Sequence, residues 1–263
     1  MNLLSLNVHA WMEDHQDQKL EHLADTIAAK DYDLIALQEV NQTIAAPIAD
    51  GEVRADNYGL ILLGLLEQRG VAGYSYHWST SHIGYDVYDE GIALLSRYPV
   101  LEAEGFYTSK SQDIHTIDSR KIIRLKVEVD GQAVEVYSCH MNLPTSQTEN
   151  QVDNLKRLVS HTDFAGVKIF MGDFNTDAIS NPQAYQTILD QGLLDTYQLA
   201  ETKDSGVTVC KSIDGWKGQS QDKRLDYVFV NQEVPVQTSR VIFNGQNQEV
   251  VSDHFGLEVS LTI

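Results

Sequence analysis

Short apolar runs alternate with amphipathic segments along the whole chain. Apolar residues spaced three and four positions apart predict helices at residues 19–29 and 148–161. Residues 58–68 are apolar enough to form another helix. Asn181-Pro182, a capping residue followed by proline in the first turn, predicts a helix that runs to Gly192.

Uninterrupted apolar runs predict buried strands. These runs lie at residues 3–8, 33–40, 91–100, 121–140, 167–175, 224–230 and 255–263. Asp130-Gly131 interrupts one of them and is typical of a two-residue hairpin turn. No linker, repeat or low-complexity tract separates these elements. We therefore predict one α/β domain over residues 1–263, with two packed sheets of mixed strands flanked by helices.

The composition is that of a globular chain with a core, since 42% of the residues are hydrophobic and 22% are charged. No apolar run approaches the ~20 residues that cross a bilayer, and the first residues lack the basic and apolar parts of a signal peptide. Two cysteines are too few for a disulfide framework, and Cys139 lies in an apolar run that predicts burial. We expect a cytoplasmic protein without a membrane partner.

The formal net charge of −19 bears on the choice of partner. Proteins that grip nucleic acid gain most of their affinity by neutralising phosphates with Lys and Arg. The cations here are scattered, with small groups only at residues 120–124 and 217–224. Nucleic acid is therefore an unfavoured partner.

Metal-competent polar residues stand at the ends of the apolar runs. They are Asn7, Glu39, His140, Asp173, Asn175, Asp226, Asp253 and His254. A single residue of this kind is more often a turn former or a hydrogen-bonded structural residue. Six recurrences of the same pattern favour one shared site, because loops at strand ends of α/β proteins open onto a cleft.

The segments SLNV, IALQEV, GDFNTD, RLDYVFV and VSDHFGLEV, in this order, resemble the endonuclease/exonuclease/phosphatase superfamily. That group includes deoxyribonucleases, abasic-site endonucleases, neutral sphingomyelinases and inositol-polyphosphate phosphatases. The resemblance implies a deoxyribonuclease-like α/β fold, a four-layer sandwich of two mixed sheets with helices outside. It also implies Mg²⁺-dependent hydrolysis of a phosphoester.

Oxygen ligands suit Mg²⁺, which needs only one or two carboxylates because it keeps several waters. Glu39 is the first choice, with Asn7 and Asp253 beside it. Mn²⁺ is a possible substitute.

The resemblance also assigns the residues that act on the phosphate. Asp173 is expected to orient and deprotonate the attacking water, and Asn175 to donate a hydrogen bond to the phosphoryl oxygens. His254 is expected to contact the phosphate while Asp226 fixes its tautomer and orientation.

Two further positions follow from neighbouring family motifs. His140 is a second phosphate contact or a proton donor, with Glu90 as its orienting carboxylate. His9 departs from the family pattern, since relatives often carry Asp, Arg or Gln there. A supporting contact is the reading we favour for it.

The substrate must be read from the loops. The segment 75–91 contains Trp78, His82 and Tyr85, and aromatic faces beside carboxylates suit a sugar ring, although Trp78 could equally pack beneath a long loop. Residues 6–42 and 82–91 resemble the maltose 6′-phosphate phosphatase branch. This resemblance predicts a phosphomonoesterase acting on a small phosphorylated sugar.

Other classes stay open. They are a Mg²⁺-dependent nuclease, a sphingomyelinase-like phosphodiesterase and a non-catalytic binding protein on the same fold, and the sequence does not give the oligomeric state. Some cations are candidates for anchoring the substrate, although solvated surface charge is the simpler reading for most of them. These are Arg120, Lys121, Lys217, Lys223 and Arg224.

Overall fold

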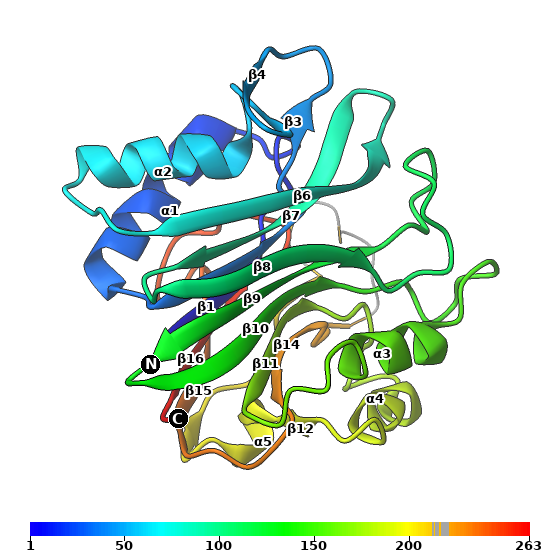
Figure 1. Cartoon of the computed structure of the whole chain (residues 1–263). Coiled ribbons are helices and arrows are strands. Elements are labelled where there is room, and N and C mark those ends of the chain that lie inside the picture. Colours follow the sequence, from blue (N-terminus) through cyan, green and yellow to red (C-terminus); the bar gives the residue numbers. More distant parts are fainter. Residues whose placement is uncertain (212, 214–215, 217–220) are drawn as a thin grey trace.

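Two β-sheets lie face to face in the computed structural model, with helices on their outer faces (Figure 1). The structure describes residues 1–211, 213, 216 and 221–263. Lys217, one of the cations considered for the substrate, lies outside the described residues.

The first sheet holds the N-terminal strand at its centre. Strand β1 (Asn2–Asn7) runs parallel to β2 (Leu34–Gln38) and antiparallel to β16 (Gly256–Leu261). On one side, β7 (Tyr88–Ser96) pairs with β2, and both β6 (Ser75–Gly84) and β3 (Gln42–Thr43) pair with β7. On the other side, β15 (Val236–Ile242) pairs with β16, and β13 (Thr202–Lys203) pairs with β15.

The second sheet contains the predicted hairpin. Strands β9 (Lys121–Val129) and β10 (Gln132–His140) turn at Asp130-Gly131, and both turn residues have positive φ, as a tight hairpin requires. Strand β10 runs parallel to β11 (Lys168–Asp173). The remaining strands are β8 (Val100–Tyr107), β14 (Asp226–Val230) and β12 (Leu194–Asp195), with β4 (Ile48–Asp50) and β5 (Val53–Arg54) forming a separate small pair.

Two helices cover each sheet. They are α1 (Gln16–Lys30) and α2 (Tyr58–Gln68) on the first, and α3 (Gln151–Val159) and α4 (Pro182–Leu189) on the second, with the short α5 (Thr196–Leu199) near β12. Asparagine side chains cap the N-termini of α2, α3 and α4. None of the helices in the described ranges combines the length and apolar character needed to cross a membrane.

Three apolar clusters hold the four layers of helices and sheets together. The central one lies between the sheets and draws residues from Leu3 to Leu261, so strands from both chain ends share one core. A second cluster joins the first sheet to α1 and α2, and a third joins the second sheet to α3 and α4. The predicted four-layer α/β sandwich is confirmed.

The structure differs from the predicted elements mainly between residues 75 and 107. The segment expected to be an aromatic loop is the hairpin β6–β7, which turns at residues 85–87. The run 91–100 is divided, because β7 ends at Ser96 and β8 begins at Val100. Strand β15 was not predicted, and helices α3 and α4 are shorter than expected.

The strand directions bring the polar strand ends to one edge of the sandwich. In the parallel pairs, Asn7 lies opposite Gln38, which precedes Glu39, and His140 lies opposite Asp173. Strand β14 is antiparallel to β11 and begins at Asp226, which pairs with Asp173. Carboxyl ends of some strands and amino ends of their antiparallel neighbours therefore meet at the same edge.

Candidate active site

Asp173 lies at the centre of the polar cluster. Its Oδ2 is 3.4 Å from Asn7 Nδ2, 3.7 Å from His140 Nε2 and 3.9 Å from His254 Nε2. Its Oδ1 accepts a hydrogen bond from the backbone N–H of Asn175 at 2.7 Å. Burial raises the pKa of Asp173 to about 7, with the Asp226 and Glu39 carboxylates adding to the shift and His254 opposing it.

Asn7 and Glu39 form the wall supplied by β1 and β2. Asn7 is fully buried and donates from Nδ2 to Glu39 Oε1 at 2.9 Å. Glu39 follows its strand with a φ of 53°, a left-handed conformation that turns the chain at the sheet edge. The Glu39 side chain stays 21% exposed, so one carboxylate of the cluster is open to solvent.

His254 and Asp226 form a buried pair on the opposite wall. His254 Nδ1 is 2.9 Å from Asp226 Oδ2, and both side chains are almost fully buried. Burial alone would lower the pKa of His254, but Asp226 outweighs this and raises the pKa well above its usual value. The ring is therefore held as an imidazolium with Nε2 towards Asp173.

His140 contrasts with His254. Its Nε2 is 3.9 Å from Glu39 Oε1, but burial, helped by the charges of Arg120, His82 and His254, lowers its pKa well below the usual value. A neutral imidazole can still present one N–H to a phosphate oxygen.

Glu90 has a different partner from the one expected. Its ligand atom lies within 4.8 Å of those of Glu39 and His140, and its Oε1 lies 3.3 Å from Nε2 of His82. Burial, and then the Glu39 charge, raises the pKa of Glu90 to about 8. Glu90 is thus part of the cluster, and His82 lies behind it as a buried side chain whose pKa burial lowers to about 4.

His9, Glu13 and Asp253 form an adjoining group. His9 Nδ1 is 2.7 Å from Glu13 Oε1 and 3.8 Å from Asp253 Oδ1. Burial lowers the pKa of His9, but the hydrogen bond with Glu13 and the nearby carboxylates prevail and raise it to about 9. Glu13 was not predicted from the sequence, where an acidic residue four positions after His9 in a polar loop is an ordinary surface feature.

The donor set fits a hard divalent cation. The described residues form three groups, and within each group the ligand atoms lie within 4.8 Å of one another: His9, Glu13 and Asp253; Glu39, Glu90 and His140; and Asp173, Asp226 and His254. Four carboxylates, those of Glu39, Glu90, Asp173 and Asp253, repel one another here, and the raised pKa values of the last three follow mainly from burial. A cation with oxygen preference would relieve that repulsion.

Trp78 and Tyr85 are placed differently. Trp78 Nε1 donates to the carbonyl of Val40 at 2.8 Å, and its ring packs over Gly91 beside the core under α1 and α2. Tyr85 lies in the β6–β7 turn with 69% of its surface exposed. Partial burial, and then the negative charge of the nearby Glu39 carboxylate, raises the pKa of its hydroxyl. The geometry therefore favours Tyr85 over Trp78 as a side chain that can reach a ligand at the site.

Two of the candidate cations are not surface charges. Arg224 is buried and forms an ion pair with Asp195 at 2.6 Å, so it is committed to the fold. Arg120 is 9% exposed, and its Nε has no hydrogen-bond partner among the described residues. Its charge helps to lower the pKa values of His140 and His82, which places it near the cluster.

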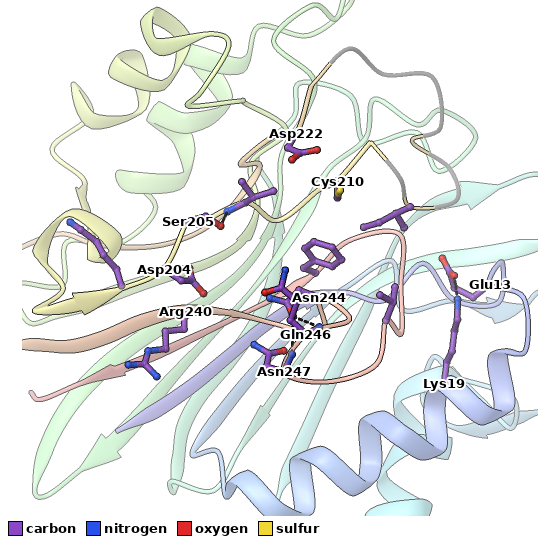
Figure 2. A pocket seen from close by; sticks show the side chains of 15 residues that line it. Glu13, Lys19, Asp204, Ser205, Cys210, Asp222, Arg240, Asn244, Gln246 and Asn247 are labelled. Carbon is purple, nitrogen blue, oxygen red and sulfur yellow. Dashed lines mark hydrogen bonds and ion pairs between the residues drawn. The ribbon is translucent and has the colours of Figure 1, made fainter.

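A separate hollow of about 1250 Å³ lies next to this site. Figure 2 shows Glu13 and Lys19 on one wall, and Asn244, Gln246 and Asn247 on the loop below. None of the described lining residues is a predicted site residue. The hollow adjoins the site because Glu13, on its wall, contacts His9 and Asp253.

Comparisons with known proteins agree with this geometry. The model of the endonuclease/exonuclease/phosphatase family matches residues 10–254. A family member from Leptotrichia buccalis is 48% identical over the full length of both chains, with a TM-score of 0.96. No curated protein matches the chain.

More distant structures share the fold. A mannosyl-6-phosphatase from Bacteroides thetaiotaomicron is 18% identical over the full length of both chains, with a TM-score of 0.72. A truncated TDP2 from Caenorhabditis elegans is 14% identical, with a TM-score of 0.65 over 100% of this chain and 97% of that one. The chain belongs to the endonuclease/exonuclease/phosphatase family, a group of hydrolases.

Proposed function

We propose that the chain is a Mg²⁺-dependent phosphomonoesterase that hydrolyses a phosphorylated sugar, with maltose 6′-phosphate as the leading candidate. The observation that carries the proposal is the buried Asp173 carboxylate, which lies at the centre of the polar cluster, 3.7 Å from His140 and 3.9 Å from His254, two imidazoles whose pKa values are shifted in opposite directions. This arrangement pairs a base with cationic and hydrogen-bonding groups that suit a phosphate.

Glu39 and Asp253 would hold Mg²⁺, together with the amide oxygen of Asn7. A metal ion held by these residues would supply positive charge to offset that of the phosphoryl oxygens. In the structure, Asn7 Oδ1 accepts the backbone N–H of His9 at 3.2 Å, while its Nδ2 faces Glu39 and Asp173. Asn7 therefore links the metal-binding wall to the base.

Asp173 would take the proton of the attacking water. A pKa of about 7 suits a base that works near neutral pH, and the Asn175 N–H fixes the orientation of the carboxylate. As the water oxygen bonds to phosphorus, the bond from phosphorus to the sugar oxygen would break. The sugar oxygen would take up a proton from solvent water and Asp173 would return its proton to solvent, so the products are the free sugar and inorganic phosphate. His254, held as an imidazolium by Asp226, would stabilise the charge on the phosphoryl oxygens.

His140 would contact the phosphate as a neutral group. The sequence left open whether it is a contact or a proton donor, and its lowered pKa supports the contact. Asn175 donates its side-chain N–H to the carbonyl of Met141 at 2.9 Å, so its contact with phosphate would use the remaining amide hydrogen or follow a rotation.

Three features support a sugar phosphate over a polynucleotide. The net charge of −19 disfavours a polyanion, and Arg224 and Arg124 are engaged in ion pairs within the fold. Tyr85 is exposed near the carboxylates and offers a ring face and a hydroxyl. A structure with the same fold is described as a mannosyl-6-phosphatase.

The test is a phosphate-release screen over sugar phosphates with Mg²⁺, run in parallel with plasmid DNA and sphingomyelin. Maltose 6′-phosphate should be hydrolysed faster than monosaccharide phosphates and far faster than plasmid DNA or sphingomyelin. The Asp173→Asn protein, purified in the same way, controls for contaminating phosphatases. Efficient nicking of plasmid without phosphate release would replace the phosphatase with a nuclease.

A further inference from the structure

Glu13 joins two parts of the site that come from opposite ends of the chain. We propose that Glu13 is a positioning residue, which fixes the metal ligand Asp253 and the neighbouring His9 through one carboxylate oxygen. The inference rests on the metal centre of the proposed function, but it does not depend on the substrate.

One oxygen of Glu13 makes both contacts. Glu13 Oε1 accepts a hydrogen bond from the backbone N–H of Asp253 at 3.0 Å, and it lies 2.7 Å from His9 Nδ1. Glu13 and Asp253 are separated by 240 residues in the sequence. The side chain of Glu13 is only 5% exposed, so these contacts are shielded from water.

The other oxygen anchors Glu13 to the scaffold. Lys19, in α1, places Nζ 2.5 Å from Glu13 Oε2. Figure 2 shows Lys19 reaching from the helix towards Glu13 on the wall of the large hollow.

The two loops that Glu13 joins also meet at other contacts near the site. Ser252 Oγ donates to the carbonyl of Asn7 at 2.6 Å, which fixes the residue before Asp253. His9 has a φ of 44°, a left-handed conformation that turns the loop back towards Glu13. Glu13 thus fixes the backbone of Asp253 directly, as partners of metal ligands commonly do.

The experiment measures metal binding without turnover. Mn²⁺ binding to the whole protein is followed by electron paramagnetic resonance for the parent and for Glu13→Gln. The variant should bind Mn²⁺ with a Kd about tenfold or more above the parent, the usual cost of losing a partner of a metal ligand. At saturating metal its kcat should return to within about threefold of the parent, because the ligands themselves are intact.

Glu21→Gln is the matched control. Glu21 lies in α1, is 53% exposed and pairs with Arg69, so its replacement removes the same charge away from the site. Its Mn²⁺ affinity should equal that of the parent within about twofold. Glu13→Asp keeps the charge but shortens the reach to Asp253, so it should also weaken Mn²⁺ binding. It is the test variant if Glu13→Gln does not fold.

Two results would overturn the inference in distinguishable ways. A folded Glu13→Gln protein that binds Mn²⁺ as tightly as the parent would remove Glu13 from the metal site and leave the proposed function intact. A parent protein that binds no Mn²⁺ would contradict the metal centre, and with it both proposals.

Discussion

Individual carboxylates in this site are held in surroundings that disfavour their charge. Burial raises the pKa of Asp173 to about 7 and that of Glu90 to about 8. On the opposite wall, the carboxylate of Asp226 offsets the cost of burying a charge on the His254 ring. Perturbed groups of this kind gather at functional sites, because tuned proton affinity and charge are what the chemistry uses. The chemistry of the site therefore depends on the shifted pKa values of these individual side chains.

Glu39→Gln tests the metal wall. The substitution keeps the shape but removes the most exposed carboxylate of the cluster, so the Mg²⁺ concentration giving half-maximal activity should rise and turnover should nearly vanish. A titration of activity against Mg²⁺, with circular dichroism to verify the fold, measures this. A titration curve like that of the parent would exclude Glu39 as a ligand.

Asp173→Asn and His254→Ala test the groups that act on the phosphate. Each should lower kcat by about a hundredfold or more, the scale expected for loss of a base or of charge stabilisation. Rates within a few-fold of the parent in both variants would refute the assigned roles.

The pair of Asp226 and His254 allows a double-mutant cycle. Asp226→Asn should give a milder loss of kcat than His254→Ala, because it disturbs the ring orientation and charge but leaves the imidazole in place. The double variant should then be little worse than His254→Ala alone. Fully additive losses would mean that Asp226 acts independently of His254.

The sequence predicts the residues that stand at strand ends but not the contacts between their loops. Asn7, His140 and Asp173 are recognisable because each ends an apolar run, and the structure brings them together. Glu13 and the partner of Glu90 were not predicted, because both depend on how loops fold. His82, in particular, is paired with Glu90 by the register of β6 and β7.

At the scale of elements, the approach of β10 and β11 sets the spacing of His140 and Asp173. A Cβ placed on Gly172 would lie 1.8 Å from the carbonyl oxygen of Cys139, and the φ of Gly172 is 148°. Only glycine fits here without moving one of the strands. The close approach is therefore built into the backbone beside the site.

Gly172→Ala should destabilise the protein by about 3 kcal/mol and reduce kcat, since either the strands separate or the backbone strains. The melting temperature and kcat of the variant measure the two effects. Gly64→Ala in α2 is the control, because a Cβ there meets nothing within 4 Å and alanine favours a helix by roughly 0.5–1 kcal/mol. An unchanged melting temperature in Gly172→Ala would show that the strands have room.

Trp78→Ala and Tyr85→Ala separate packing from substrate contact in the β6–β7 hairpin. Trp78→Ala should cost about 2–3 kcal/mol of stability, less than for a fully buried tryptophan, and should affect a sugar phosphate and p-nitrophenyl phosphate equally. Tyr85→Ala should leave the melting temperature unchanged and raise KM for the sugar phosphate more than for the small ester. The reverse pattern would make Trp78 the substrate contact.

Element prediction succeeded for strands made of one apolar run and missed strands rich in polar residues. Strands β2 and β11 are buried along their whole length, β1 is buried after its first residue, and all three read as apolar runs. Strand β6 carries histidines, serines and a threonine, and residues 237–240 of β15 form a polar run, so neither strand has the same signature. These two segments are strands because their backbones pair with β7 and β16.

At the scale of the molecule, the sandwich unites the two ends of the chain in one site. Strands β1 and β16 are neighbours in the first sheet, so Asn7 and Asp253 lie near each other although one begins and the other nearly ends the sequence. The surplus of acidic over basic residues, 38 against 19, gives the molecule a negative net charge that disfavours polyanions. Small phosphorylated substrates are consistent with both features.

Release of inorganic phosphate from maltose 6′-phosphate, measured with Mg²⁺, with EDTA and after Mg²⁺ is restored, tests the central claim most directly. The account predicts steady release with Mg²⁺, none with EDTA, recovery on restoring the metal, and a loss of about a hundredfold or more in Asp173→Asn. Release that continues in EDTA, or that Asp173→Asn retains, would contradict a metal-dependent phosphomonoesterase centred on this carboxylate.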